Sequence, residues 1–200
     1  MKAADAIAAL LAHRTDEIAF CALGMAAGEW WRQSRSDADF YLHGAMGFSA
    51  SMALGFALSL PQAKIWAINS DGSLCMNLGC LLTEVEQAPR NLKHFVLDNK
   101  VYETVGAVPM VNRGRTDYCA LARAAGFASA RSLQTVEEID AVMPEIIAAD
   151  GPCMTVLEVQ SDGGAGQPEA MDYEGPEIKY RFGRSIEKRF GVSVFGKQGY

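Results

Sequence analysis

The sequence lacks the features that mark several common classes of protein. Its five cysteines include no C-x-x-C pair, and their scattered positions in apolar surroundings favour reduced, buried thiols over disulfides or a zinc site. Positive charge is not in excess, because 18 Lys and Arg stand against 24 Asp and Glu, and a net charge of −6 gives no field that would hold a nucleic acid backbone. Small molecules and proteins are therefore the expected partners.

Long apolar segments suited to a membrane are also missing. The uncharged run at residues 44–63 contains Ser49, Ser51, Ser59 and Pro61, and we interpret it as a buried helix. Residues 1–14 have no small-residue cleavage site of the kind that ends a secretory signal. We therefore expect no membrane association and a cytoplasmic location.

What the sequence does have is enough apolar material for one core. Half of its 200 residues are hydrophobic and 21% are charged, which suits one folded domain with at most an appendage. Short apolar runs alternate with longer amphipathic ones. We expect strands at residues 18–23, 40–42, 65–68, 92–97 and 154–159, and helices at 3–12, 46–60, 74–87, 117–125 and 136–149. This alternation predicts an α/β fold, a doubly wound, mostly parallel sheet with helices on both faces.

The composition changes after residue 160. Residues 161–177 carry Gly, Pro and acidic residues without a period, which is typical of a linker. Residues 178–200 have a net charge of about +5, against about −11 for residues 1–177. We predict a domain at 1–160 and a linker with a basic tail at 161–200. The tail is either solvated, docked on an acidic partner subunit or closed over an anionic substrate.

Polar residues follow two of the predicted strands. The strand at 65–68 leads into Asp71, Gly72 and Ser73, and the strand at 92–97 leads into Asn99. If these strands are neighbours, the carboxylate and the amide converge at one edge of the sheet, where their oxygens suit Mg²⁺. Gly72 and Ser73 open the following helix, whose N–H groups favour a phosphate. Together these features predict a site for a diphosphate and magnesium.

The strand-Asp-Gly-Ser-helix-strand-Asn arrangement resembles the thiamine diphosphate-binding signature of thiamine-dependent enzymes. The resemblance implies Mg²⁺ ligation by Asp71, by the Asn99 side chain and by the Val101 carbonyl, with Gly72, Ser73 and Tyr102 beside the cofactor. Ser70 stands where the signature usually has glycine, and it would strain the turn by about 1 kcal/mol if the position needed a positive φ.

A second segment carries the same resemblance. Residues 44–47, Gly-Ala-Met-Gly, are similar to a stretch of the acetolactate synthase and sulfopyruvate decarboxylase branches. By that similarity Met46 bends the cofactor from below, and the Gly44 carbonyl accepts a hydrogen bond from its 4′-amino group. Ala45 belongs to the same contact. Glycine lets a backbone approach a ring closely, and methionine is an adaptable apolar support.

Residues 15–160 resemble the β subunit, or diphosphate-binding half, of sulfopyruvate and phosphonopyruvate decarboxylases. The residues that suggest this branch are those at 40–47, 76–79, 97–99 and 102–106. The resemblance implies the thiamine diphosphate-binding fold in its PP-type form. It also implies decarboxylation of a short anionic 2-oxo acid, 3-sulfopyruvate or 3-phosphonopyruvate, to the aldehyde and CO₂. Residues 107–110 replace a more polar stretch of the branch.

Few side chains are candidates for proton transfer or substrate binding. His43 precedes the Gly-Ala-Met-Gly segment, and an imidazole suits proton donation at neutral pH. Glu103 follows the metal turn, as do three cations that suit an anionic substrate: Lys100, Arg113 and Arg115. His94 alternates with Leu92 and Val96 on a strand, and we interpret it as a packing or surface residue.

In the family, a glutamate on a separate pyrimidine-binding domain activates the cofactor. The α/β pattern of this chain is used up by residue 160, so the resemblance implies a pyrimidine-binding α subunit as partner and a hetero-oligomer that is active only when assembled. A carboligase like acetolactate synthase and a catalytically silent binding or regulatory subunit remain alternatives. A nicotinamide-binding domain is disfavoured because no G-x-G-x-x-G follows the first strand.

Overall fold

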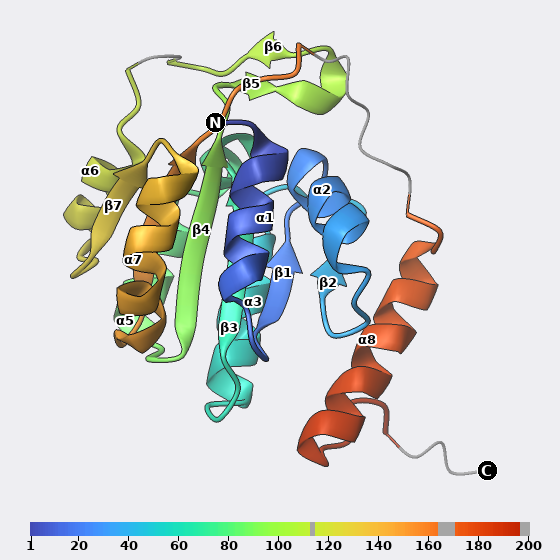
Figure 1. Cartoon of the computed structure of the whole chain (residues 1–200). Helices are drawn as coiled ribbons and strands as arrows, with labels where there is room; N and C mark the ends of the chain where they lie inside the picture. The colour runs from blue at the N-terminus through green and yellow to red at the C-terminus, as the bar shows by residue number, and fades with distance from the viewer. Residues whose placement is uncertain (113–114, 164–170, 197–200) are drawn as a thin grey trace.

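The computed structural model describes residues 1–112, 115–163 and 171–196, and its centre is a six-stranded parallel sheet (Figure 1). The strand order is β2-β1-β3-β4-β8-β7, and each neighbouring pair is parallel. The strands are β1 (Ile18–Cys21), β2 (Phe40–Tyr41), β3 (Ile65–Ser70), β4 (Leu92–Asp98), β7 (Ala130–Leu133) and β8 (Cys153–Glu158). From β1 the chain adds β2 on one side, and β3 and β4 on the other, with β8 inserted between β4 and the edge strand β7, so the doubly wound α/β class is confirmed.

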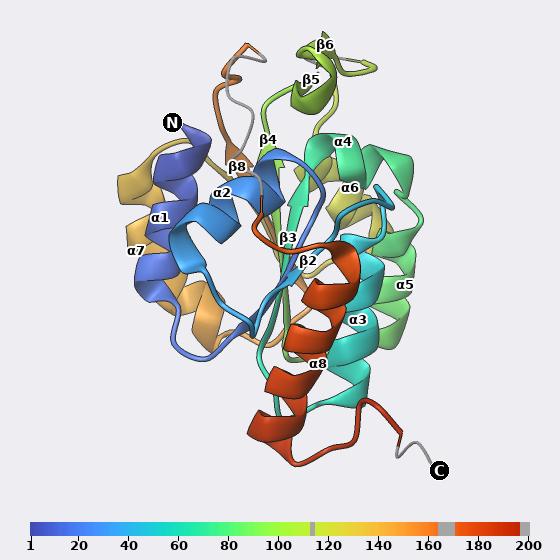
Figure 2. The ribbon, with the colours of Figure 1, turned by 90° about the vertical axis from the view of Figure 1, so that its right-hand side faces the viewer.

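Helices cover both faces of the sheet (Figure 2). One face carries α1 (Ala3–His13), α2 (Met25–Ser34) and α7 (Val136–Ala148). The other carries α3 (Ser49–Ser59), α5 (Cys80–Gln87) and α6 (Tyr118–Ala125), with the short α4 (Asp71–Met76) at its top. Because both faces are covered, all seven residues of β4 are buried, as is usual for a central parallel strand.

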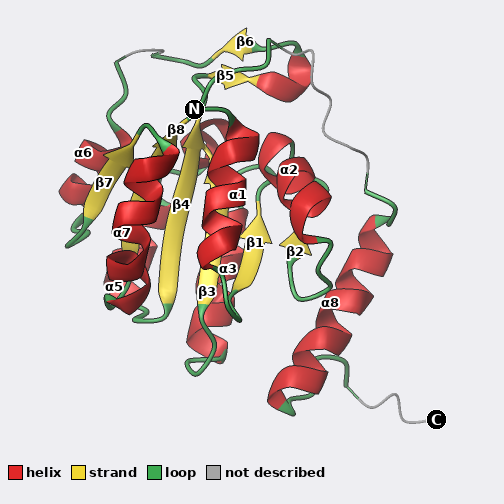
Figure 3. Ribbon diagram, in the orientation of Figure 1, coloured by secondary structure: helices red, strands yellow, loops and turns green. Residues whose placement is uncertain are grey.

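A small antiparallel hairpin lies above the carboxyl edge of the sheet (Figure 3). It consists of β5 (Val101–Tyr102) and β6 (Val108–Pro109), joined by the 3₁₀ turn η1 (Glu103–Val105). The hairpin leaves β4 directly, so residues 99–105 lie over the ends of the strands. No helix in the described part of the chain is both long and apolar enough to cross a membrane.

Three elements differ from the prediction. The helix expected at 74–87 is two helices, α4 and α5, because the chain turns at residues 77–79, where the Asn77 side chain donates to the Gly47 carbonyl. Helix α2 and strand β7 were not predicted. The sequence carries no polar side-chain cap before α2, which begins after Gly24 at φ 93°, and β7 is a short, half-exposed edge strand.

The end of the chain also differs. Part of the segment expected as linker and basic tail forms helix α8 (Gly175–Phe190), which lies against the β2 side of the sheet. Its Ile178, Phe182 and Ile186 are buried in the core. Basic side chains of α8 pair within the chain, since Arg181 lies 2.8 Å from Glu177 and Arg184 lies 2.6 Å from Glu187. The domain boundary at residue 160 stays a prediction.

Candidate functional site

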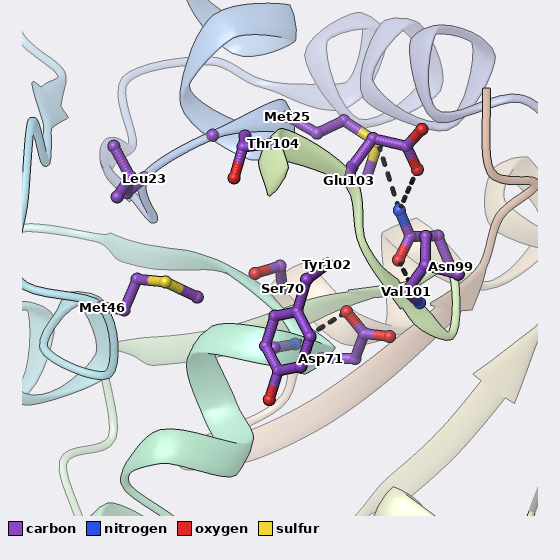
Figure 4. A pocket seen from close by; sticks show the side chains of 12 residues that line it. Leu23, Met25, Met46, Ser70, Asp71, Asn99, Val101, Tyr102, Glu103 and Thr104 are labelled. Carbon is purple, nitrogen blue, oxygen red and sulfur yellow. Dashed lines mark hydrogen bonds between the residues drawn. The ribbon is translucent and has the colours of Figure 1, made fainter. Parts of the chain in front are cut away.

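Strands β3 and β4 are neighbours, with Ser70 opposite Leu97, so their carboxyl ends open at the same point of the sheet edge. Asp71 follows β3 directly and Asn99 follows β4 directly. The two side chains face one cavity from adjacent strand ends, together with the hairpin above them (Figure 4). The pairing of β3 with β4 therefore brings the Asp71 and Asn99 side chains together, as the sequence predicted.

Asp71 ties the two strand ends together. Its carboxylate is 1% exposed, and its Oδ1 accepts from the Gly72 N–H at 2.7 Å while Oδ2 accepts from the Lys100 N–H at 2.7 Å. Burial, and then the neighbouring Asp98 carboxyl, raise the pKa of Asp71 to about 7. A divalent cation at this point would offset the cost of burying the charge.

Asn99 is fixed from both ends of its amide. Its Oδ1 accepts from the Val101 N–H at 3.1 Å, and its Nδ2 donates to Glu103 Oε2 at 3.0 Å. The same Oε2 accepts from the Ser161 hydroxyl at 2.8 Å, so a residue beyond position 160 reaches the site. Glu103, which is 8% exposed, therefore holds the orientation of Asn99 in this structure.

The segment at residues 44–47 is attached to the start of α4. The Gly47 N–H donates to Ser73 Oγ at 2.9 Å, and the Asn77 amide donates to the Gly47 carbonyl at 2.9 Å. Gly47 has φ 89°, and a Cβ there would lie 3.0 Å from Cβ of Asn77, so a side chain would disturb the contact. Met46 enters the cavity wall from this segment (Figure 4).

The cavity contains about 330 Å³ of space continuous with solvent. It is lined by Leu23, Gly24, Met25, Met46, Ser70, Asp71, Gly72, Asn99, Val101, Tyr102, Glu103 and Thr104. Seven of these were predicted site residues. Sequence reasoning missed Leu23, Gly24, Met25 and Thr104, although Gly24 ends the first predicted strand at the edge where ligands gather.

Other predicted site residues do not line this cavity. His43, Gly44 and Ala45 are exposed on the turn after β2, and Ser73 is buried behind the cavity, bonded to Gly47. Lys100 pairs with Asp98. Arg115 is exposed, and Arg113 lies outside the described residues.

The turn between β3 and α4 differs from the expectation at Ser70. Ser70 has φ −120° and caps α4, with its Oγ accepting from the Ser73 N–H at 3.3 Å, so the residue is unstrained. The Gly72 N–H is engaged by Asp71. Thus the first N–H groups of α4, expected to face a phosphate, have partners within the chain in this structure. The absence of a side chain at Gly72 lets the Tyr102 ring pack closely against the backbone, because a Cβ there would lie 2.9 Å from Cε1 of Tyr102.

The donor set at the cavity fits Mg²⁺ better than a softer metal. The described residues hold no group of three or more His, Cys, Asp or Glu side chains around one point. A cation beside Asp71 would need the Asn99 amide oxygen, a backbone carbonyl and oxygens of a bound ligand, which is the mixture that Mg²⁺ takes.

Comparison with known proteins adds independent information. Residues 21–158 match the family described as thiamine pyrophosphate enzyme, C-terminal TPP binding domain. The chain is 32% identical over 182 residues to the β subunit of sulfopyruvate decarboxylase from Methanothermobacter thermautotrophicus, covering 91% of this chain and 94% of that protein. It is 28% identical over 184 residues to the Methanococcus maripaludis β subunit, covering 92% of this chain and 97% of that protein.

A third relative is longer than this chain. The phosphonopyruvate decarboxylase of Streptomyces viridochromogenes is 32% identical over 153 residues, which cover 76% of this chain and 38% of that protein. The chain thus spans less than half the length of the phosphonopyruvate decarboxylases that it matches. With most of its length matched by the family, and with the strand ends and cavity described above, this chain belongs to the thiamine pyrophosphate enzymes, as their C-terminal TPP binding domain.

Proposed function

We propose that the chain is the cofactor-binding subunit of a thiamine diphosphate- and Mg²⁺-dependent decarboxylase. Its proposed substrate is a short anionic 2-oxo acid, 3-sulfopyruvate or 3-phosphonopyruvate, which is converted to the aldehyde and CO₂. The observation that carries the proposal is the convergence of buried Asp71 and Asn99 on a cavity that Met46 also lines. The names of its relatives as sulfopyruvate and phosphonopyruvate decarboxylases support the reaction and the substrate class.

The proposed Mg²⁺ ligands are Asp71, the Asn99 side chain and the Val101 carbonyl. The raised pKa of Asp71 supports this choice, because its causes are burial and the Asp98 carboxyl, both of which a bound cation would offset. Gly72, Ser73, Tyr102 and the segment at 44–46 are the proposed cofactor contacts. Met46 lies on the cavity wall, where its thioether can support an aromatic ring.

Thiamine diphosphate, when bound, supplies a carbon that adds to the substrate carbonyl and accepts the electrons released with CO₂. The chain's own residues bind, orient and exclude water around that chemistry. Glu103 fixes Asn99 through the bond to its Nδ2 and is the carboxyl of the hairpin nearest the cavity. His43, exposed after β2, remains our candidate for proton donation at the open side.

We further propose a pyrimidine-binding α subunit as partner, which supplies the activating glutamate in a hetero-oligomer. The name "subunit beta" of two relatives supports a partner. Large apolar side chains near the cavity also support one, since Phe48 and Met76 are 55% exposed and Val105 is 66% exposed. Five free cysteines fit a reducing cytoplasm.

Purified alone with thiamine diphosphate and Mg²⁺, the chain should release no CO₂ from sulfopyruvate, phosphonopyruvate or pyruvate. Adding the subunit that co-purifies with it should restore turnover, because the activating glutamate then completes the site. Release of CO₂ is measured with and without an acceptor aldehyde, which distinguishes decarboxylation from carboligation. Robust turnover by the isolated chain would refute the shared site. Failure of the assembled pair to bind the cofactor would favour a silent subunit.

Cofactor binding should weaken as the pH falls below about 7. Mg²⁺ needs the Asp71 carboxylate, which a proton occupies below its pKa of about 7, so the apparent Kd for thiamine diphosphate with Mg²⁺ should rise about tenfold per pH unit. Without metal, the raised pKa has the opposite effect on folding. Because the folded state disfavours the Asp71 carboxylate, the free energy of unfolding is unaffected by this group below pH 3.8 and decreases as the pH rises to about 7.

Calorimetric titration between pH 5.5 and 8.5 measures this dependence. Asp98→Asn is the control, because the Asp98 carboxyl contributes to the raised pKa of Asp71. In that variant the midpoint should move to lower pH, whereas ionisation of the cofactor's own phosphates would leave it in place. A midpoint that is the same in both proteins would rule out Asp71 as the titrating group.

A further inference from the structure

Behind the cavity lies a buried polar cluster that the proposed function does not use. It consists of Asn69 on β3, His94 on β4 and Glu84 on α5, each 1% exposed or less. His94 was expected to be a packing or surface residue. It is a buried packing residue, and in addition both of its ring nitrogens have hydrogen-bond partners. Burying a carboxylate and an imidazole is costly unless they are hydrogen-bonded. Glu84 is held through Oε2, which bonds His94 Nδ1, while its Oε1 is buried without a hydrogen-bond partner.

The hydrogen bonds of the cluster have one consistent direction. Asn69 Nδ2 donates to His94 Nε2 at 3.2 Å, which leaves the proton of the neutral ring on Nδ1, where it faces Glu84 Oε2 at 3.3 Å. The opposite orientation of the Asn69 amide would set its NH₂ against the Ser70 N–H. In the orientation present, Asn69 Oδ1 accepts from that N–H at 3.0 Å.

The cluster ends at the turn that carries the proposed metal ligand. The Ser70 N–H donates the last bond, to Asn69 Oδ1; Ser70 also caps α4 through its side chain and is followed by Asp71. From there the bonds continue to Ser73, whose hydroxyl accepts from the Gly47 N–H beside Met46. None of the three cluster residues lines the cavity, so their effect on a ligand is indirect, and the hydrogen bonds described here lead to this turn.

We propose that His94, oriented by Glu84, is a positioning residue for the Asp71 turn. It fixes the Asn69 amide, which fixes the Ser70 N–H and hence the direction in which the Asp71 carboxylate faces the cavity. Burial, and then the Glu84 charge, raise the pKa of the neighbouring Cys80 thiol to about 12, which keeps it protonated. This inference rests on the proposed cofactor site.

The test compares His94→Leu with Met154→Ala in the chain assembled with its partner subunit. Met154 is fully buried and lies opposite His94 in the β4–β8 register, so its truncation also weakens the core. We expect the Kd for thiamine diphosphate with Mg²⁺ to rise about tenfold or more in His94→Leu and to stay within about twofold in Met154→Ala. Equal Kd values for wild type and His94→Leu would overturn the proposal.

Two further measurements keep the proposal decidable. If His94→Leu does not fold, Glu84→Ala should weaken cofactor binding. Glu84→Gln, which keeps an oxygen for His94 Nδ1–H, should bind the cofactor as the wild type does. Equal Kd values for Glu84→Ala and Glu84→Gln would contradict the proposal. In the cofactor-free protein, amide hydrogen exchange at residues 69–73 should be faster in His94→Leu than in Met154→Ala. Hydrogen exchange needs no ligand. If the wild type did not bind the cofactor, the proposed function would be overturned, but the exchange rates would still test whether His94 holds the Asp71 turn.

Discussion

Asp71→Asn is expected to lower Mg²⁺-dependent binding of thiamine diphosphate by at least about 100-fold, since even residues behind metal ligands typically contribute 10–100-fold. The substitution removes the negative charge from the cavity. The carboxylate accepts from the Gly72 N–H through one oxygen and from the Lys100 N–H through the other. The asparagine side chain has a single acceptor oxygen, so one of these two hydrogen bonds is lost. Calorimetric titration of the cofactor in the presence of Mg²⁺ measures the loss.

Asp117→Asn is the matched control for this experiment. Asp117 also lies near the sheet edge, where it caps α6 by accepting from the Ala120 N–H at 2.8 Å, and it does not line the cavity. Asparagine caps a helix as well as aspartate does, so this variant should fold and bind the cofactor like the wild type. Comparable loss of binding in both variants would show that the effect is not specific to Asp71.

Arg14→Leu is expected to lower the free energy of unfolding by roughly 3–5 kcal/mol, because it leaves a buried carboxylate without its cation. That carboxylate belongs to Asp39, which is 1% exposed and accepts from Arg14, Trp30, Ser34 and the Ala19 N–H. The cluster joins the end of α1 to α2 and to the chain entering β2. In a protein of this size the midpoint of thermal unfolding should fall by more than about 6 °C.

Arg90→Leu provides the comparison for Arg14→Leu. Arg90 pairs with Asp150 at 2.6 Å, but both side chains are exposed, at 80% and 63%. Solvent screens such a pair, so its removal should leave the free energy of unfolding nearly unchanged. Similar unfolding midpoints for the two variants, measured by circular dichroism at pH 7, would mean that the buried pair contributes no more than the exposed one.

Much of the fold was predictable because the signal was local. The buried strand β3 begins with four apolar residues in a row and β4 contains three, and helix α7 begins with a complete capping box at Thr135 and Glu138. Helix α8 also had a signal, since Ile178, Phe182 and Ile186 recur at helical spacing between Pro176 and Gly191. Its net positive charge led to the interpretation as a tail, although charge alone does not exclude a buried face.

For the site, the sequence by itself determined which chemical groups are available. Asp71, Asn99 and Met46 were identifiable because residue types after buried strands, and a signature shared with a family, are local properties of the chain. Gly24 and Thr104 were not, because they meet only when the hairpin folds over the end of β1: a Cβ at Gly24 would lie 2.8 Å from Thr104 Cγ2.

The tertiary structure alone decided which of these groups share one cavity and which are held in place. The pairing of β3 with β4 brings together side chains 28 positions apart, and this depends on contacts that no single segment encodes. The same pairing sets His94 beside Asn69 and turns a strand histidine into a buried hydrogen-bonding partner. Sequence fixes local preference and chemistry, whereas packing fixes distance, burial and the pKa of Asp71, because these depend on neighbours far along the chain.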